Sequence, residues 1–314
     1  MSLWFEQLIK FTTDSVGLER TFRLVQSVVQ ILSRFALPFD LLLYVLTLST
    51  ASPPTVTATR TILAVLNQRI GLARRYFRLF RFLESFNAAQ KIYSRLASSA
   101  SSSGPRRPAW VQVEPWLDMS SKTFNGLYFL LEATTTVDAL AVPGLRVWAP
   151  EQERRVATEA QRFWLFGLVC GLLFNLLEIL NVLACTPVPA TGSGFGGVGT
   201  GESTAEAEAE DEKKGEVSEK EKLANDLKKE QLRLRAIVRG RKQQRVLWRR
   251  EVQGKISKLG RGAVANALDT ILPGSAIGWL NVEPGTVSLA MFVTTILTGM
   301  DVWERCGREV LAGK

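Results

Sequence analysis

Residues 163–185 read FWLFGLVCGLLFNLLEILNVLAC, and they decide the fold class because they are long and apolar enough to cross a membrane. A helix of these 23 residues reaches about 34 Å, whereas a hydrocarbon core is about 30 Å thick. Fourteen Leu, Ile, Phe and Val residues favour insertion by roughly 7 kcal/mol. Glu178, the one charged residue, opposes insertion by at most about 3.5 kcal/mol. We therefore predict a transmembrane helix at 163–185.

Small and polar residues gather on one side of this predicted span. On a helical wheel they fall within an arc of about 120°, and they are Gly167, Gly171, Asn175, Glu178 and Asn181. The two glycines form a GxxxG pattern, which is typical of close helix–helix contacts in membranes. We predict a helix-packing face, with a pore-lining stripe or a buried core helix as the alternatives.

A second apolar segment covers residues 276–300. Its uncharged part, Thr286–Met300, has only 15 residues, so a full crossing must include Glu283 and Pro284. We predict a second transmembrane segment, with a re-entrant or interfacial segment as the alternative. The basic residues nearest the two spans place both chain termini on the cytosolic side; they are Arg154, Arg155, Arg162, Arg305, Arg308 and Lys314.

Composition excludes several classes of protein. The chain has 314 residues and no histidine, which removes His-based nucleophile pairs, histidine general bases and HExxH zinc sites. Its 3 cysteines are widely spaced, so neither a disulfide framework nor a zinc ribbon is indicated. A mean hydropathy of +0.07 is too low for a polytopic transporter. We predict a protein that is not an enzyme and needs no metal or cofactor.

The net charge of +9 favours an anionic partner, and the N-terminal third carries much of it. Within it, Leu72–Phe86 reads LARRYFRLFRFLESF, which places arginines on one side of a helix and apolar rings on the other. Such a helix suits the surface of an anionic membrane. The predicted membrane-binding residues are Arg74, Arg75, Arg78, Arg81, Leu72, Phe77, Phe80 and Leu83. The alternative is an ordinary bundle helix with a solvated basic face.

The rest of the chain divides by composition. Residues 1–97 form an amphipathic helical region, in which Leu18, Phe22, Val25, Val29 and Leu32 recur at helical spacing. The other predicted segments are a Ser/Pro linker at 98–109, a mixed helical region at 110–162, a disordered Gly-rich and acidic linker at 186–221, a basic helical region at 222–272 and a polar tail at 301–314. The basic region could bind RNA, although no nucleic-acid motif accompanies it.

Two stretches resemble a known family. Phe5–Gln26, FEQLIKFTTDSVGLERTFRLVQ, is similar to the start of the peroxin-eleven family of peroxisomal membrane-remodelling proteins. Leu72–Glu84, LARRYFRLFRFLE, resembles that family's membrane-inserting amphipathic helix. The resemblance covers roughly the first 95 residues, and only the hydrophobic pattern agrees beyond them. Phe80 and the acidic insert at 202–221 depart from the pattern, and we expect a fungal-type member.

The resemblance implies an all-α integral protein of the peroxisomal membrane. It implies binding to anionic membrane lipids, bending and elongation of the membrane, and thereby peroxisome proliferation and fission. It further implies self-association into a homo-oligomer, a fission adaptor, a dynamin-related GTPase and the peroxisomal membrane-protein import receptor as partners, and no nucleic acid. A peroxisomal solute channel is the alternative function, and a basic RNA-binding scaffold is the second alternative.

Overall fold

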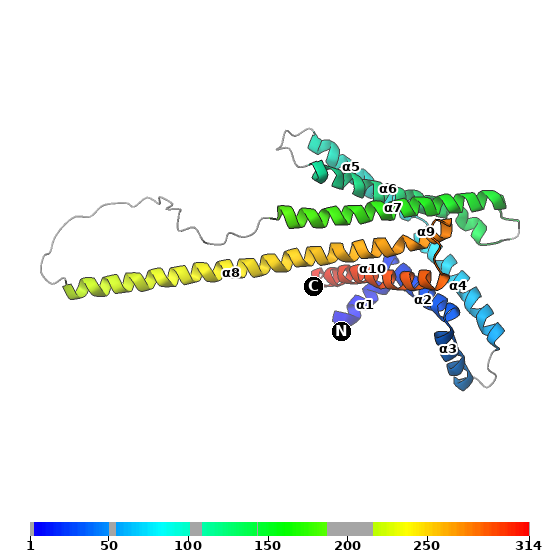
Figure 1. The fold of residues 1–314 in the computed structure, drawn as a ribbon, viewed down its shortest axis with the longest axis horizontal. Helices are drawn as coiled ribbons and strands as arrows, with labels where there is room; N and C mark the ends of the chain where they lie inside the picture. The colour runs from blue at the N-terminus through cyan, green and yellow to red at the C-terminus, as the bar shows by residue number, and fades with distance from the viewer. Residues whose placement is uncertain (1–2, 50–54, 101–108, 143, 187–215, 314) are drawn as a thin grey trace. The chain divides into compact units, whose positions relative to one another are not determined.

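The computed structural model describes residues 3–49, 55–100, 109–142, 144–186 and 216–313, and these are helical with no β-strand among them (Figure 1). The all-α prediction is therefore confirmed. In chain order the helices are α1 (Leu3–Thr13), α2 (Ser15–Arg34), α3 (Ala36–Ser49), α4 (Val56–Arg78), α5 (Arg81–Ala100), α6 (Ala109–Ala139), α7 (Pro150–Cys185), α8 (Glu216–Asp269), α9 (Ile271–Ile277) and α10 (Pro284–Ala312).

Contacts divide the chain into two units. One comprises Met1–Asn181 together with Ser257–Lys314, and the other comprises Val182–Ile256. The second unit consists of the end of α7 and most of α8 within the described residues. All contacts discussed below lie within the first unit.

Local capping sets the first helices. The carboxylate of Asp14 accepts a hydrogen bond from the backbone N–H of Gly17 at 3.1 Å, which caps the start of α2. Gly17 is needed because α1 turns sharply into α2. A Cβ atom at Gly17 would lie 2.1 Å from the carbonyl oxygen of Phe11. Similarly, the hydroxyl of Thr55 accepts from the N–H of Ala58 at 3.3 Å and caps α4.

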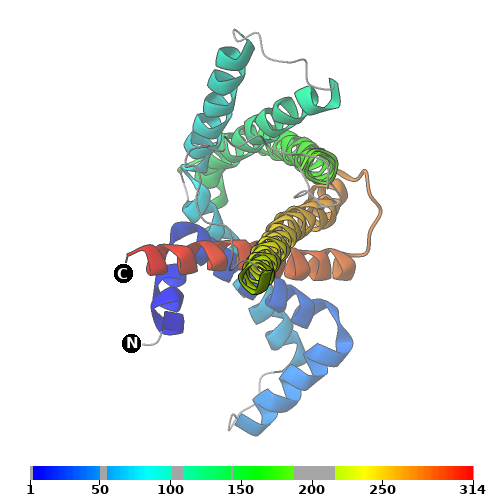
Figure 2. The ribbon, with the colours of Figure 1, turned by 90° about the vertical axis from the view of Figure 1, so that its left-hand side faces the viewer.

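Helix α2 is the centre of the first unit, packed against α3, α4 and α10. The apolar core lies where α2, α3 and α4 meet, and its buried residues are Val29, Phe39, Leu63 and Ile70. The ends of the chain also meet, since α1 packs on α10 and the two helices lie side by side (Figures 1 and 2). There the amide of Gln7 donates to the carbonyl oxygen of Trp303 at 2.8 Å.

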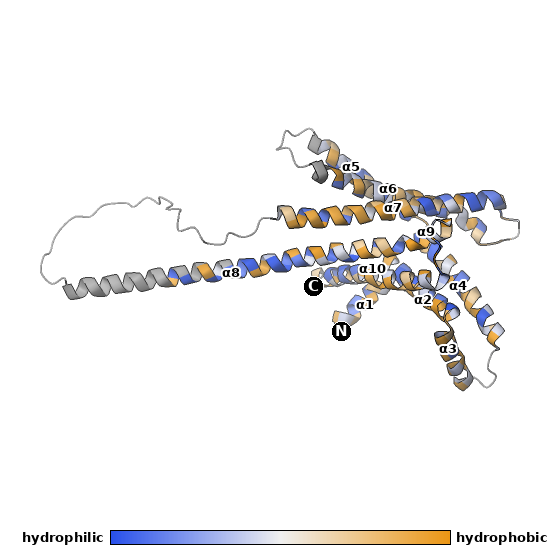
Figure 3. Cartoon of the chain, in the orientation of Figure 1, coloured by the Kyte–Doolittle hydropathy of each residue, from blue (hydrophilic) through white to orange (hydrophobic). Residues whose placement is uncertain are grey.

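Two helices, α7 and α10, are long and apolar enough to cross a membrane. The transmembrane segment predicted at 163–185 forms the C-terminal part of α7, which beyond a polar first third is mostly hydrophobic with a few polar positions (Figure 3). Helices α2 and α3 together pass the same test, although they are bent by 97° at their junction. Two predicted spans are thus helices of sufficient length and hydropathy.

The second predicted span differs from 276–300 in its limits. Helix α9 ends at Gly278, whose φ of 86° terminates the helix. Helix α10 then starts at Pro284. Proline suits this position because the first residues of a helix have no intrahelical partner for their N–H groups, so the absence of an N–H costs no hydrogen bond. The apolar segment is therefore interrupted, and α10 gains its length from residues beyond Met300 instead.

Helices extend into both of the segments that were predicted to be linkers. Helix α8 begins at Glu216, inside the linker predicted at 186–221, and residues 187–215 lie outside the described part of the chain. Likewise α5 continues to Ala100, and residues 101–108 of the Ser/Pro linker lie outside it. The mixed region at 110–162 consists of α6 and the first turns of α7.

Candidate functional site

The candidate membrane-binding stretch Leu72–Phe86 is not one continuous helix. Helix α4 ends at Arg78 and α5 begins at Arg81, with turn hydrogen bonds from the N–H of Leu79 to the carbonyl of Tyr76 and from the N–H of Leu83 to the carbonyl of Phe80. This stretch is therefore a pair of helices joined by a turn. The break coincides with a change of packing, because α4 packs mainly on α2 and contacts α6 near its end, whereas α5 packs on α6. A helical wheel drawn across Leu79 does not describe both helices.

Arg74 points into the protein and not toward solvent. Its side chain is 11% exposed, and its Nε and Nη2 atoms donate to Oε1 of Glu19 at 3.2 and 2.9 Å. Its Nη1 atom donates to Oε1 of Gln26 at 2.6 Å. Both partners lie on α2, so this arginine joins α4 to α2.

Arg78 is held in the same way by α6. Its Nη2 atom donates to Oε1 of Glu132 at 2.7 Å, and its Nη1 atom donates to the hydroxyl of Tyr128 at 3.2 Å. The guanidinium of Arg81 lies 5.3 Å from the ring centre of Phe129, also on α6. The three arginines expected on the lipid-facing side thus contact α2 and α6 in this structure, while Arg75 is half-buried.

Burial and the close charges shift the pKa values of these groups. Burial alone raises the pKa of Glu19, but Arg20 and Arg74 beside it outweigh burial and hold that pKa far below its usual range. Burial lowers the pKa of Arg74 to about 10, with Arg78 acting in the same direction. Burial also lowers the pKa of Arg78, yet Glu132 outweighs it and raises that pKa above its ordinary value. All three groups therefore stay charged at neutral pH.

The carboxylates Glu19 and Glu132 were not among the predicted site residues. They lie 55 and 54 positions from their arginines in the sequence, so no helical spacing connects them. The one sequence signal is that Glu19 interrupts the basic N-terminal region, which holds few acids. Such pairing needs the tertiary structure.

The apolar side of α4 and α5 is exposed. We call it the apolar flank, and it comprises Ile62, Val65, Leu66, Tyr76, Phe80 and Leu83. Phe80 is 70% exposed and Leu83 is 57% exposed. Two residues that were predicted to insert into the membrane are not part of this exposed surface. Leu72 is half-buried, and Phe77 stacks on Phe22 of α2 with 5.4 Å between ring centres. Against the alternative of a bundle helix with a solvated basic face, Arg74 and Arg78 are turned inward and the apolar flank is exposed, although Leu63 and Ile70 of α4 lie in the apolar core.

Helix α3 continues the exposed apolar surface. Its outward residues are Leu37, Leu41, Tyr44, Val45 and Leu48, and each is more than half exposed. Contiguous apolar surface of this kind is characteristic of a membrane or partner contact. Helix α4 thus buries Arg74 as well as the core residues Leu63 and Ile70, while large apolar side chains elsewhere on it stay exposed.

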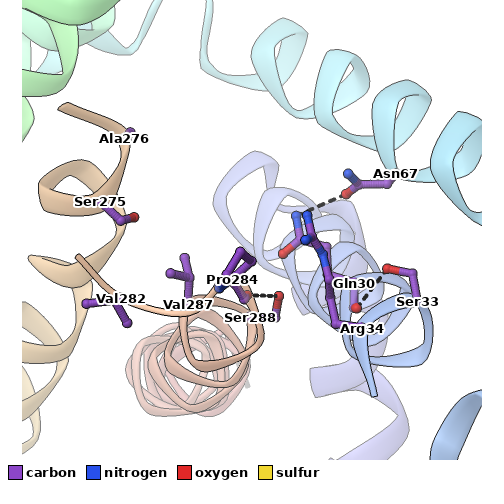
Figure 4. Close-up of a pocket in the computed structure, with 10 residues that line it drawn as sticks. All are labelled: Gln30, Ser33, Arg34, Asn67, Ser275, Ala276, Val282, Pro284, Val287 and Ser288. Atoms are coloured by element: carbon purple, nitrogen blue, oxygen red, sulfur yellow. Dashed lines mark hydrogen bonds between the residues drawn. The ribbon is translucent and has the colours of Figure 1, made fainter. Parts of the chain in front are cut away.

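Polar groups also fill the space between α2, α4, α9 and α10. A cavity of about 330 Å³ there is lined by Gln30, Arg34, Asn67 and Ser288 among others (Figure 4). The side-chain amide of Gln30 donates to Oδ1 of Asn67 at 3.0 Å across it. This cavity extends the pattern of polar side chains turned inward.

The predicted packing face of α7 lies against α6 and α8. Gly167 approaches α6, where its carbonyl oxygen accepts from the hydroxyl of Ser121 at 2.8 Å. A Cβ atom at Gly171 would lie 2.9 Å from Nδ2 of Asn266 on α8. In turn, a Cβ at Gly262 of α8 would lie 3.1 Å from Nδ2 of Asn175. These three predicted residues therefore lie in helix–helix contacts within the chain.

The two remaining residues of this face belong to a small polar cluster with α6. Nδ2 of Asn181 donates to Oε2 of Glu114 at 3.2 Å. Burial raises the pKa of Glu114 to about 7, and a hydrogen bond with Glu178 and the charge of that residue act in the same direction. Glu114 therefore keeps its proton until the pH approaches neutrality. Glu114 was not predicted, because nothing local to it in the sequence marks it.

Comparison with known proteins identifies the family. The family model described as Peroxisomal biogenesis factor 11 (PEX11) matches residues 5–303, which include the apolar flank, the whole of α7 and the first two thirds of α10. No curated protein and no solved structure matches the chain. A match over nearly the whole chain shows the family, so the chain belongs to the peroxisomal biogenesis factor 11 (PEX11) family and is a peroxisomal membrane protein that acts in peroxisome proliferation.

Proposed function

We propose that this protein binds and bends the peroxisomal membrane by inserting the apolar flank of α4 and α5 into one leaflet, and that it thereby elongates peroxisomes before fission. One observation carries the proposal. The charged side of α4 is satisfied internally by Glu19 and Glu132, whereas large apolar side chains at the α4–α5 junction are exposed. Water is a poor environment for such a surface, and the acyl boundary of a bilayer is a good one.

Burial of the flank supplies the free energy for insertion. Each fully buried Leu, Ile or Phe side chain contributes about 1.5–3 kcal/mol. Phe80, Leu83 and Ile62 are each more than half exposed, so they alone contribute several kcal/mol by that measure. Basic residues near an anionic surface add about 1 kcal/mol each, and Arg60, Arg69 and Arg75 are the cations of α4 without an internal ion pair among the described residues.

The buried arginines have a different role in this proposal. Arg74 and Arg78 fix α4 to α2 and α6, so that the flank is presented at a fixed orientation. A rigid helix inserted at shallow depth expands one leaflet more than the other, and this asymmetry favours curvature. Direct contact of Arg74, Arg78 and Arg81 with lipid phosphates remains a prediction that requires these internal contacts to open.

The test uses the full chain reconstituted in anionic vesicles, with tubule formation measured by electron microscopy. We expect the double variant Phe80→Glu, Leu83→Glu to lose most tubulation, because it places charge where apolar rings would enter the bilayer. The matched control is Leu145→Glu, since Leu145 is an exposed leucine between α6 and α7, away from the flank. Equal tubulation by the double variant and the control would overturn the proposal.

We also propose the associations that the family membership suggests. These are self-association, contact with a fission adaptor and a dynamin-related GTPase, and delivery by the peroxisomal membrane-protein import receptor. A solute channel is the second candidate function. It is favoured by the polar cluster of Glu114, Glu178 and Asn181, which places ionisable groups against a candidate span.

A further inference from the structure

A second cavity, of about 250 Å³, lies deep in the first unit and is strongly basic. Helices α2, α4, α5, α6, α7, α8 and α10 contribute to its wall. Five cationic side chains line it: Arg20, Arg23, Arg78, Arg81 and Lys122. Two carboxylates line it, namely Glu19 and Asp269. The lining therefore carries three more positive than negative charges.

Groups just behind the wall do not remove this excess. Glu132 pairs with Arg78, and Asp118 lies 3.9 Å from Nζ of Lys122. Arg74, however, adds a positive charge to the count, because its ion-pair partner Glu19 is already counted among the lining carboxylates. With these three groups included, two positive charges remain uncompensated in a largely buried space. Buried charge without a counterion is unfavourable by several kcal/mol, so the protein has a reason to bind an anion here.

Hydrogen-bond donors in the cavity are also unused. The buried Nε atoms of Arg20, Arg23 and Arg78 have no acceptor among the described residues. The Nε atom of Arg20 lies 3.6 Å from Oε2 of Glu19, which is too far for a hydrogen bond. Burial lowers the pKa of Arg20 to about 10, and the nearby Arg23 and Arg81 act in the same direction although Glu19 opposes them.

The wall also gives the cavity its shape and an entrance. Aromatic rings of Tyr128, Phe129 and Trp164 form part of it, and the guanidinium of Arg81 rests on Phe129 at 5.3 Å without an ion pair among the described residues. The side chain of Lys122 is 46% exposed, so the cavity is open to the surface on that side. A small anion can therefore reach the arginines.

We propose that this cavity is a binding site for a phosphate group, because it brings Arg20, Arg23 and Arg81 together with two uncompensated positive charges and unused guanidinium donors. A phosphate monoester carries close to two negative charges at neutral pH. Planar guanidinium groups match phosphate oxygens in geometry and bind them by charge-assisted hydrogen bonds. The site differs from the apolar flank, and its ligand is either a soluble phosphate ester or the headgroup of a phosphomonoester lipid.

The experiment uses the full chain in nanodiscs of neutral lipid at low ionic strength. Inorganic phosphate and glycerol 3-phosphate are titrated as soluble probes, with calorimetric affinity and melting temperature as readouts. A parallel preparation contains phosphatidic acid in the nanodisc lipid. Binding of the soluble probes identifies a soluble ligand, and stabilisation by phosphatidic acid alone identifies a lipid headgroup. Either outcome supports the site when substitution of the cavity arginines weakens the binding or the stabilisation.

Variants connect the binding to the cavity. We expect Arg20→Gln and Arg81→Gln each to weaken phosphate affinity about tenfold, which is the effect of losing one charge-assisted hydrogen bond. The matched control Arg95→Gln removes an exposed charge from α5 and leaves the affinity unchanged. Without phosphate, Arg81→Gln keeps or raises the melting temperature, because it relieves repulsion, and this shows that it folds. Absence of binding by every probe, or equal binding by Arg20→Gln, Arg81→Gln and Arg95→Gln, would overturn the inference.

Discussion

At the scale of single residues, the notable feature is that charged side chains are turned inward. Glu19 is a clear case, because its side chain is 3% exposed and contacts Arg74 at 2.9 Å. Removing one partner of a buried pair leaves the other charge unsatisfied, which is destabilising by about 3–5 kcal/mol. We expect Glu19→Gln to lower the free energy of unfolding by roughly that amount, as measured by denaturant titration of tryptophan fluorescence in detergent.

The control is the same substitution in an exposed pair. Glu159 contacts Arg162 on the same helix, with half of its side chain exposed. We expect Glu159→Gln to change stability by less than about 1 kcal/mol. Equal destabilisation by the two variants would show that the Glu19–Arg74 pair is not buried in solution.

Residue by residue, the sequence predicts which side chains share a helix side but not which side faces inward. The spacing from Leu72 to Arg78 correctly separates the arginines from most of the rings. It cannot reveal that Glu19 and Glu132 capture Arg74 and Arg78, because those carboxylates lie on other helices. Which of the apolar side chains of α4 are buried, such as Leu63 and Ile70, and which stay exposed is set by the helices packed against it, and no local pattern encodes that.

At the scale of helices, lengths and apolar stretches are predictable, whereas breaks set by packing are not. The span at 163–185 follows from composition alone. The break after Arg78 does not, since no Gly or Pro marks it and the cause is packing on two different helices. The start of α10 at Pro284 could have been predicted, because Pro is favoured in the first turn and disfavoured inside a helix.

The contact between α6 and α7 leads to a prediction about pH. The pKa of Glu114 is raised to about 7 in the folded protein, first by burial and then by Glu178. In the unfolded chain an ordinary glutamate ionises near pH 4.3. Between these values the folded state holds the extra proton, so stability falls as the pH rises toward 7 and levels off above it.

We therefore expect the melting temperature in detergent to be higher at pH 5 than at pH 8. The variant Glu114→Gln stays neutral and keeps the hydrogen-bonding ability of the protonated form, so it should lose much of this dependence. An exposed glutamate, Glu251, provides the control Glu251→Gln. A pH dependence that is the same in all three proteins would contradict the assignment to Glu114.

At the scale of the whole molecule, two crossings determine where each part of the chain lies. If α7 and α10 both span the bilayer, the residues that lead into α7 and those that follow α10 lie on one side, and the end of α7 lies on the other. The C-terminal part of α8 then returns to the depth of the spans, because Asn266 approaches Gly171 and Asp269 pairs with Arg23. The arginines that flank the spans, Arg162 before the apolar part of α7 and Arg305 after that of α10, favour the cytosol for the first group. The apolar flank then faces the cytosolic leaflet, which is the leaflet that the proposed membrane-bending role requires.

This topology is tested with epitope tags on the full chain in intact peroxisomes. We expect added protease to remove tags at either terminus, and a tag inserted between Gly196 and Gly201 to be cut only after detergent opens the membrane. A matrix protein that resists protease provides the control for intact organelles. Loss of all three tags in intact peroxisomes would mean that the two helices do not both cross. In that case α10, whose apolar part is the shorter one, would lie along the surface beside the flank.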